Sequence, residues 1–115
     1  MSDVSYMGRH VIADLHDVSA DVLCSIDFWK DLLIDAAKKS GATVLSDHFH
    51  HFGEGYGITG VIVLSESHIS IHTWPEKNYA AVDAFMCGNC DPQIALDHIM
   101  SKINSDVTKD LIYRK

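Results

Sequence analysis

Three apolar segments with strand character follow one another in the middle of the chain, over residues 58–64, 68–74 and 79–86. The connections between them are short, and strands joined in this way pair antiparallel, because a parallel crossover needs roughly a dozen residues or more. Pro75 ends the second segment, since proline lacks the backbone N–H that a sheet ladder needs. A glycine-rich loop at 53–57 precedes the first segment. The chain is therefore expected to fold around an antiparallel sheet.

Two amphipathic helices are predicted on either side of these strands. The first covers about residues 22–40 and stops at Gly41, with Ser19 or Ser25 as alternative N-caps. The second begins at Asp91-Pro92, with aspartate at the cap and proline at the first helical position. Apolar residues recur at helical spacing in both helices: Trp29, Leu32, Leu33, Ala36 and Ala37 in the first, and Ile94, Ala95, Ile99, Met100 and Ile103 in the second.

Further strands are predicted over residues 9–15, 42–52 and 107–113, which gives the order β-α-β-β-β-β-α-β. No repeat or linker divides the chain, so residues 1–115 are expected to form a single domain. We predict an α+β fold, a two-layer sandwich in which two helices cover one face of an antiparallel sheet. The other face of the sheet would need a cover, and a homodimer would supply one.

Composition disfavours several classes of function. The 115 residues include 9 basic and 16 acidic side chains, a net charge of −7, and without a basic block nucleic-acid binding is disfavoured. No apolar run approaches the roughly 18 residues that a membrane span needs, and residues 1–8 lack the pattern of a signal peptide. Three cysteines, an odd number, fit reduced thiols. We therefore expect a cytoplasmic protein with a small-molecule ligand and with neither nucleic-acid nor membrane partners.

The segment from Leu64 to Glu76 carries more polar chemistry than a strand requires. It holds a Glu66-Ser67 bond, His68, His72 and a Trp-Pro-Glu corner within an apolar pattern. A serine hydroxyl is a weak nucleophile at neutral pH, but a strained turn can aim it at the preceding carbonyl carbon. The acyl group then moves from nitrogen to oxygen, and elimination of the ester cuts the chain and leaves a terminal keto group. These steps need a proton shuttle and an oxyanion stabiliser nearby.

The pattern resembles a known family over most of the chain. The stretch Ser65-Glu66-Ser67-His68-Ile69-Ser70-Ile71-His72-Thr73-Trp74-Pro75-Glu76 is followed by Tyr79-Ala80-Ala81-Val82-Asp83 and Phe85-Met86-Cys87-Gly88. Earlier landmarks are Gly8-Arg9-His10, Ser40-Gly41-Ala42-Thr43 and Tyr56-Gly57. Together they are similar to the pyruvoyl-dependent S-adenosylmethionine decarboxylase proenzymes of bacteria and archaea. The resemblance implies an antiparallel sheet with helices on one face, in a dimer of processed protomers with active sites near the interface.

The resemblance also implies self-cleavage between Glu66 and Ser67, into a β chain of residues 1–66 and an α chain of residues 67–115. Ser67 would become a pyruvoyl group, a covalent cofactor that forms a Schiff base with the substrate amine. It would withdraw electrons as CO₂ leaves, the role that pyridoxal phosphate plays elsewhere. The implied reaction is decarboxylation of S-adenosylmethionine to the aminopropyl donor for spermidine synthesis.

The other site residues follow from the same resemblance. His72 would serve processing, and Cys87 would donate the proton that replaces the lost carboxylate. Glu76 would contact the ribose hydroxyls of the substrate, and Phe52 would stack on its adenine. Thr59 stands where relatives usually have serine, and its hydroxyl would support processing. No metal ligand belongs to this set.

Strand geometry limits how these residues can meet. His68, Ser70 and His72 alternate with isoleucines, so they are expected to share one face of a strand. Ser67 and His72 are five residues apart, and a continuous strand would point them to opposite faces. The resemblance implies a turn at Glu66-Ser67 that removes this conflict.

Other functions are compatible with parts of the sequence. An enzyme of this fold could instead decarboxylate a basic amino acid, arginine or ornithine, and the loop at 53–57 is where such a change would show. His48 and His50 share a strand face, and with His68 and His72 they could hold a structural metal. The chain would then be a non-catalytic metal-binding module, and an uncleaved chain could equally be a regulatory homologue.

The pair Cys87-x-x-Cys90 has the spacing of a zinc or a redox motif. Zinc is disfavoured, because structural zinc sites usually combine two such pairs and no second pair is present. Gly88-Asn89 between the two cysteines indicates a turn. The redox interpretation stays open.

Overall fold

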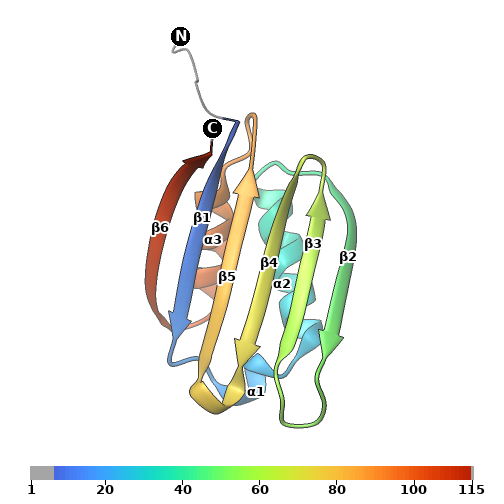
Figure 1. Ribbon diagram of the computed structural model, residues 1–115, viewed down its shortest axis with the longest axis vertical. Helices are drawn as coiled ribbons and strands as arrows, with labels where there is room; N and C mark the ends of the chain where they lie inside the picture. Colours follow the sequence, from blue (N-terminus) through green and yellow to red (C-terminus); the bar gives the residue numbers. More distant parts are fainter. Residues whose placement is uncertain (1–6, 115) are drawn as a thin grey trace.

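The sheet is the framework of the molecule. In the computed structural model, which describes residues 7–114, six strands form one antiparallel sheet in the order β2-β3-β4-β5-β1-β6 (Figure 1). The strands are β1 (Gly8–His16), β2 (Val44–His51), β3 (Ile58–Leu64), β4 (Ser67–Trp74), β5 (Tyr79–Met86) and β6 (Asp106–Arg114). All the strands predicted from the sequence are present, and β3 and β5 have the predicted bounds.

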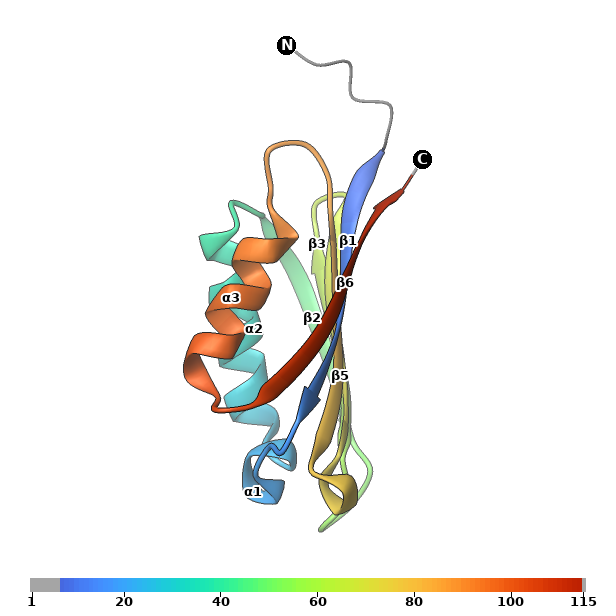
Figure 2. The same cartoon turned by 90° about the vertical axis from the view of Figure 1, so that its left-hand side faces the viewer.

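The helices lie on one face of this sheet. The helices α2 (Ile26–Lys39) and α3 (Pro92–Lys102) pack against each other and against the strands, and the short α1 (Ala20–Leu23) precedes α2 (Figure 2). A 3₁₀ turn, η1 (Pro75–Lys77), joins β4 to β5. The predicted α+β two-layer sandwich is confirmed.

The predicted helix over residues 22–40 is wrong in its first part, because the chain breaks at Cys24 and Ser25 into α1 and α2. The hydroxyl of Ser25 accepts a hydrogen bond from the backbone N–H of Phe28 at 3.1 Å, whereas Ser19 makes no side-chain cap. Carbonyls at the break accept hydrogen bonds from side chains outside α1: Trp29 Nε1 to Val22 (2.9 Å), Thr73 Oγ1 to Leu23 (2.8 Å) and His51 Nε2 to Cys24 (3.1 Å).

The other helix ends follow the predictions. Gly41 stops α2 with a φ of +91°, and its N–H and that of Ala42 donate to carbonyls of the last turn. Asp91 caps α3, its carboxylate accepting from the N–H of Gln93 at 2.9 Å. One detail is wrong: Ile94, predicted on the buried face of α3, is 44% exposed. The buried stripe of α3 consists of Pro92, Ala95, Leu96 and Ile99.

The hydrophobic core fills the space between the helices and the sheet. Each strand turns alternate side chains toward the helices, as the period of two requires. Burying one such leucine or isoleucine stabilises the fold by roughly 1.5–3 kcal/mol, so this contact holds the two layers together. The largest fully buried side chains include Leu15, Trp29, Leu33, Ile62, Ile69, Ile71, Met86 and Ile99.

Within residues 7–114, no helix covers the second face of the sheet (Figure 2). Polar side chains occupy its centre, and His68, Ser70 and His72 share this face as predicted. Apolar side chains surround them, and several are substantially exposed: Ile12 41%, Val63 39%, Trp74 38% and Ile112 39%. We refer to this surface as the open face.

The structure differs from the sequence prediction at the start of β2. β2 begins at Val44 rather than at residue 42, because Ala42 completes the end of α2, and a bulge interrupts pairing between Val44 and Ser46.

The expectation about a signal peptide concerns residues 1–8, of which 1–6 lie outside the described residues. Within residues 7–114, every helix is too short or too polar to cross a bilayer.

Candidate active site

Ser65 and Glu66 form the tight turn between β3 and β4, in which Leu64 pairs with Ser67. Glu66 has a left-handed backbone with a φ of +61°, a conformation that costs a non-glycine residue about 1–2 kcal/mol. Strained residues of this kind concentrate at functional sites, where the surrounding structure holds them in place. The turn implied at Glu66-Ser67 is therefore present, and its strain lies directly before Ser67.

The Cys87 thiol lies against the same peptide bond. Its Sγ is 3.3 Å from the carbonyl oxygen of Glu66 and 3.7 Å from the Ser67 Oγ. This contact arises because β4 and β5 pair with His68 opposite Phe85, which brings the start of one strand beside the end of the other. Glu66, Ser67 and Cys87 form what we call the cleavage cluster, at the upper end of the sheet in Figure 1. A cavity of about 660 Å³ borders Glu66 and Cys87.

This arrangement suits attack on the Glu66 carbonyl. A tetrahedral intermediate would place negative charge on the Glu66 oxygen, and a donor already in contact with that oxygen stabilises the charge. The Cys87 S–H is such a donor, although a thiol donates only weakly. The sequence pattern gave Cys87 a role in the later proton transfer alone, and its contact with Glu66 places it beside the predicted cleavage bond as well.

A second group of predicted site residues gathers at the other end of β4. Thr59 and His72 face each other across β3 and β4, and Thr59 Oγ1 and His72 Nδ1 share a hydrogen bond of 3.2 Å. A cavity of about 310 Å³ borders both of them together with Phe52, Trp74 and Glu76. We call these five residues the His72 cluster.

Local backbone geometry shapes the second cavity. The turn η1 places Glu76 beside it, and the turn ends at Asn78, which has a left-handed backbone and donates its side-chain N–H to the Val18 carbonyl at 3.0 Å. Gly57 lets the chain approach β4 closely, because a Cβ at this position would lie 2.0 Å from the carbonyl oxygen of Thr73. The glycine of the Tyr56-Gly57 landmark is thus required by contact.

The two clusters do not meet within one protomer. Ser67 and His72 stand at opposite ends of β4 (Figure 1), and five residues of strand span roughly 17 Å. Their side chains also point to opposite faces, because β4 pairs in regular register with both neighbouring strands. The turn at Glu66 aims Ser67 at Cys87 and leaves His72 at a distance.

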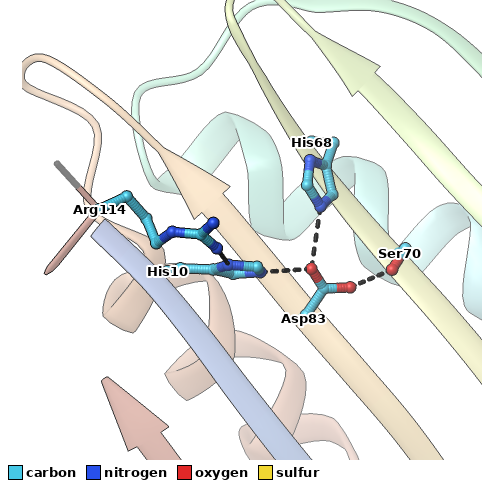
Figure 3. A network of polar contacts seen from close by, with 5 residues as sticks. All are labelled: His10, His68, Ser70, Asp83 and Arg114. Atoms are coloured by element: carbon cyan, nitrogen blue, oxygen red, sulfur yellow. Dashed lines mark hydrogen bonds and ion pairs between the residues drawn. The ribbon is translucent and has the colours of Figure 1, made fainter. Parts of the chain in front are cut away.

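A polar network occupies the open face between the two clusters (Figure 3). Asp83 on β5 accepts hydrogen bonds from His10 Nε2 at 2.6 Å and from His68 Nε2 at 2.9 Å. Its second carboxylate oxygen accepts from the Ser70 hydroxyl, and the Arg114 guanidinium donates to His10 Nδ1 at 3.1 Å. We call these five residues the Asp83 network.

The charges in this network are set by its hydrogen bonds. Partial burial pushes the pKa of Asp83 upward, but the hydrogen bonds that its carboxylate accepts outweigh burial and hold the pKa well below 3.8. The hydrogen bond to Asp83 raises the pKa of His68 above 6.5, against the opposing effect of burial. The carboxylate is therefore ionised, and His68 keeps its proton to a higher pH than an ordinary histidine.

Comparison with known proteins identifies the family of this chain. A sequence profile of S-adenosylmethionine decarboxylase matches residues 9–113. The chain belongs to the S-adenosylmethionine decarboxylase family. An S-adenosylmethionine decarboxylase proenzyme of Geobacillus sp. (strain WCH70) is 43% identical over 105 residues, 91% of this chain and 84% of the relative. The proenzyme of Thermodesulfovibrio yellowstonii is 42% identical over 102 residues, 88% of this chain and 75% of the relative.

A solved structure extends the likeness to the fold. The crystal structure of the adenosylmethionine decarboxylase from Aquifex aeolicus VF5 matches with a TM-score of 0.85 and 38% sequence identity, over 95% of this chain and 91% of that one. The decarboxylase family suggested by the cleavage motif is confirmed. The names of the relatives favour S-adenosylmethionine over arginine or ornithine as the substrate of this family.

The metal site predicted from four histidines does not form. Register places His50 opposite Thr59 and His48 opposite Val61, so β3 separates both from the histidines of β4. Backbones two strands apart lie roughly 9–10 Å from each other, and among the described residues the four histidines together do not form a group whose ligand atoms lie within 4.8 Å of one another. The alternative of a metal-binding module therefore loses its ligand set.

Another cluster, His10, His68 and Asp83, has metal-ligand atoms within 4.8 Å of one another. Its hydrogen bonds argue against coordination. Arg114 has only donors, so His10 Nδ1 must accept and His10 Nε2 must carry the proton that it gives to Asp83. A neutral imidazole bound to a metal through Nε2 carries its proton on Nδ1 and could not accept there.

The sequence pattern assigned no role to Asp83 or Arg114, and it named His10 only as a landmark. Their contacts join β1, β4, β5 and β6, so they depend on strand order and register. The only local signal was polar residues at alternate positions of predicted strands, which a solvated face would also produce.

Proposed function

We propose that this chain cleaves itself between Glu66 and Ser67 and then decarboxylates S-adenosylmethionine with a pyruvoyl group derived from Ser67. The observation that carries the proposal is the cleavage cluster, in which the Cys87 thiol contacts both the Glu66 carbonyl oxygen and the Ser67 hydroxyl. The word proenzyme in the names of the relatives supports a processed chain. The products would be residues 1–66 and 67–115.

In the cleavage step, the Ser67 Oγ attacks the Glu66 carbonyl carbon while its proton passes to a base. The bond from Glu66 carbon to Ser67 nitrogen then breaks, and an ester joins the two residues. Loss of a proton from the Ser67 Cα expels the Glu66 carboxylate, and water replaces the nitrogen of residue 67 as ammonia leaves. The Cys87 thiol donates to the Glu66 oxygen throughout the attack, which lowers the barrier.

The base in this sequence is best supplied by a second copy of the chain. Within one protomer His72 lies roughly 17 Å from Ser67 along the strand, although His72 is the predicted processing residue. We therefore propose a homodimer in which the open faces cover each other and the His72 cluster of one protomer reaches around the end of the partner's sheet to its cleavage cluster. The exposed apolar side chains of the open face, such as Ile12 and Val63, support this packing.

The residues that would bind substrate lie in the His72 cluster. Phe52 exposes 58% of its surface beside the cavity of about 310 Å³ and offers a ring for stacking. The Glu76 carboxylate accepts hydrogen bonds from hydroxyl groups such as those of a ribose. A carboxylate also suits the positive charge of a sulfonium substrate.

Residue 67 supplies the reactive carbonyl once it is converted, and this carbonyl withdraws electrons as the carboxylate leaves the substrate. Ser67 fits the conversion because its hydroxyl lies beside the thiol that contacts the preceding carbonyl oxygen. Cys87 holds a proton 3.7 Å from the Ser67 Oγ, a position from which it can return a proton to the product carbon. The cavity beside Cys87 gives space for that carbon.

The test is release of CO₂ from carboxyl-labelled substrates by the purified chain. S-adenosylmethionine should be decarboxylated, whereas arginine and ornithine should not. Ser67→Ala should release no CO₂ from any of the three, because it cannot form the carbonyl. Activity of Ser67→Ala, or release from arginine or ornithine alone, would contradict the proposal.

A further inference from the structure

The cysteine pair of the loop after β5 has a geometry that the decarboxylation chemistry does not explain. Cys87 and Cys90 are the ends of a four-residue turn, in which the N–H of Cys90 donates to the Cys87 carbonyl at 3.4 Å. Gly88 inside the turn has a φ of +66°, which a residue with a side chain would rarely adopt. The sequence therefore builds a turn whose two ends are Cys87 and Cys90.

This turn meets the distance requirement of a disulfide. A hydrogen-bonded four-residue turn holds its end Cα atoms within about 7 Å, and disulfides join Cα atoms about 4.4–6.8 Å apart. Both thiols are free and partly exposed. Both also border the cavity of about 660 Å³, through which a small reagent can reach them.

The loop is fastened at the Cys90 end. The Arg9 guanidinium donates to the Cys90 carbonyl at 2.7 Å and lies 3.7 Å from the Asp91 carboxylate. The N–H of Asp91 donates to the Ser40 carbonyl at 3.3 Å. These contacts fix the backbone at the Cys90 end of the turn.

We propose that Cys87 and Cys90 form a reversible disulfide when the protein meets a low-molecular-weight disulfide. One cysteine thiolate attacks a sulfur of the small disulfide and releases one small thiol. The second cysteine then attacks the resulting mixed disulfide and releases the other small thiol. Two protein thiols are oxidised and the small disulfide is reduced to two thiols, so atoms and electrons balance.

The consequence follows from the position of Cys87, and this part rests on the proposed function. Oxidation removes the S–H that contacts the Glu66 carbonyl and the Ser67 side chain. The proton donor for decarboxylation is then absent, and a general acid typically contributes about 10²–10⁴-fold to a rate. The disulfide would therefore switch off an enzyme that has already been processed.

The third cysteine provides a control. Cys24 ends α1, at the lower end of the molecule in Figure 1, whereas Cys87 and Cys90 follow the upper end of β5. Cys24 cannot pair with either of them without unfolding. Cys24→Ser should therefore respond to oxidants as the wild type does.

The experiment equilibrates the full chain with mixtures of reduced and oxidised glutathione and records mass and CO₂ release for wild type, Cys90→Ser and Cys24→Ser. In the wild type and in Cys24→Ser, the chain carrying Cys87 should lose two hydrogen atoms. Activity of the oxidised fraction should fall about 100-fold and return with dithiothreitol. Cys90→Ser can form only a glutathione adduct, so its inactivation should need a ratio of oxidised to reduced glutathione at least about tenfold higher.

Two results would overturn the proposal. One is a wild-type chain that gains glutathione or stays unchanged in mass instead of losing two hydrogens. The other is inactivation of the wild type and Cys90→Ser at the same glutathione ratio. The mass measurement reports the disulfide equally well on an uncleaved, inactive chain, so failure of the proposed function is distinguishable from failure of the switch.

Discussion

The Cys87 Sγ lies 3.3 Å from the carbonyl oxygen of Glu66, the oxygen of the peptide bond that precedes Ser67. Two features of the fold create this contact: the strained turn at Glu66 and the register of β4 against β5. The same thiol is thus placed to stabilise negative charge during cleavage and to deliver a proton afterwards. Under the proposed function, one side chain would take part in both maturation and catalysis.

Substitution of Cys87 should affect both steps, to different extents. Cys87→Ala removes the donor to Glu66 and should slow self-cleavage, and it should lower decarboxylation by roughly 10²–10⁴-fold because the general acid is lost. Cys87→Ser keeps a hydroxyl donor, so its cleavage should stay closer to the wild-type rate. Cleavage is followed by gel electrophoresis and decarboxylation by CO₂ release. Equal cleavage rates for wild type, Cys87→Ala and Cys87→Ser would contradict a role of the thiol in maturation.

The distance between Ser67 and His72 predicts complementation between protomers. His72→Ala alone should cleave slowly, and Ser67→Ala alone should not cleave at all. When the two variants are co-expressed, the His72→Ala chain should be cleaved, because its partner supplies an intact His72. Mass spectrometry distinguishes the two chains. An uncleaved His72→Ala chain in verified mixed dimers would place the processing histidine within its own protomer.

The Asp83 network should stabilise the fold most strongly at mildly acidic pH. Because the pKa of Asp83 is lowered on folding, its contribution is present above 3.8 and is lost as the pH falls toward the folded-state value. Because the pKa of His68 is raised, its contribution is complete below 6.5 and is lost as the pH rises through the folded-state value. Both contributions are present together between 3.8 and 6.5.

The variant Asp83→Asn should therefore lose most stability within that interval. Urea unfolding of wild type and Asp83→Asn, at a pH inside the interval and on either side of it, gives the difference directly. Asp110→Asn on the exposed strand β6 is the control and should show little change. A loss of stability in Asp83→Asn that is independent of pH would contradict the assigned charges.

The break between α1 and α2 gives a prediction about capping. Ser25→Ala removes the hydroxyl that accepts from the Phe28 N–H, so it should lower the free energy of unfolding by about 1 kcal/mol. Ser19→Ala removes no side-chain cap and should change stability by only a few tenths of that amount. Urea unfolding of both variants makes the comparison, and equal losses would show that Ser25 has no special role.

Sequence periodicity predicted the strands well where glycine or proline residues mark the ends of a strand. The start of β3 after the glycine-rich loop, the end of β4 before Pro75 and the end of β5 before Gly88 were correct, and the α+β layers followed from two amphipathic helices. The break at Cys24 was missed because its stabilising partners, such as Thr73, are distant in sequence. Local helical spacing continues across the break and gives no sign of it.

The candidate site, like the fold, could be predicted only in part from the sequence. The residues of the motif were identified from their neighbours in the chain, and the contact between Ser67 and Cys87 follows from the strand pairing that the motif implied. The Asp83 network required the positions of β1 and β6, and it could not be predicted without strand order. The alternation of side chains along a strand already predicted that Ser67 and His72 would be separated. Within a single protomer the two residues remain apart.

Self-cleavage at Ser67 is tested most directly by the intact mass of the purified wild-type chain under denaturing conditions, with Ser67→Ala as the control. We expect two fragments that divide between Glu66 and Ser67, the second beginning with a keto group that borohydride reduces. Ser67→Ala should remain a single chain. A single uncleaved wild-type chain, or a C-terminal fragment that begins with an ordinary serine, would contradict a pyruvoyl enzyme.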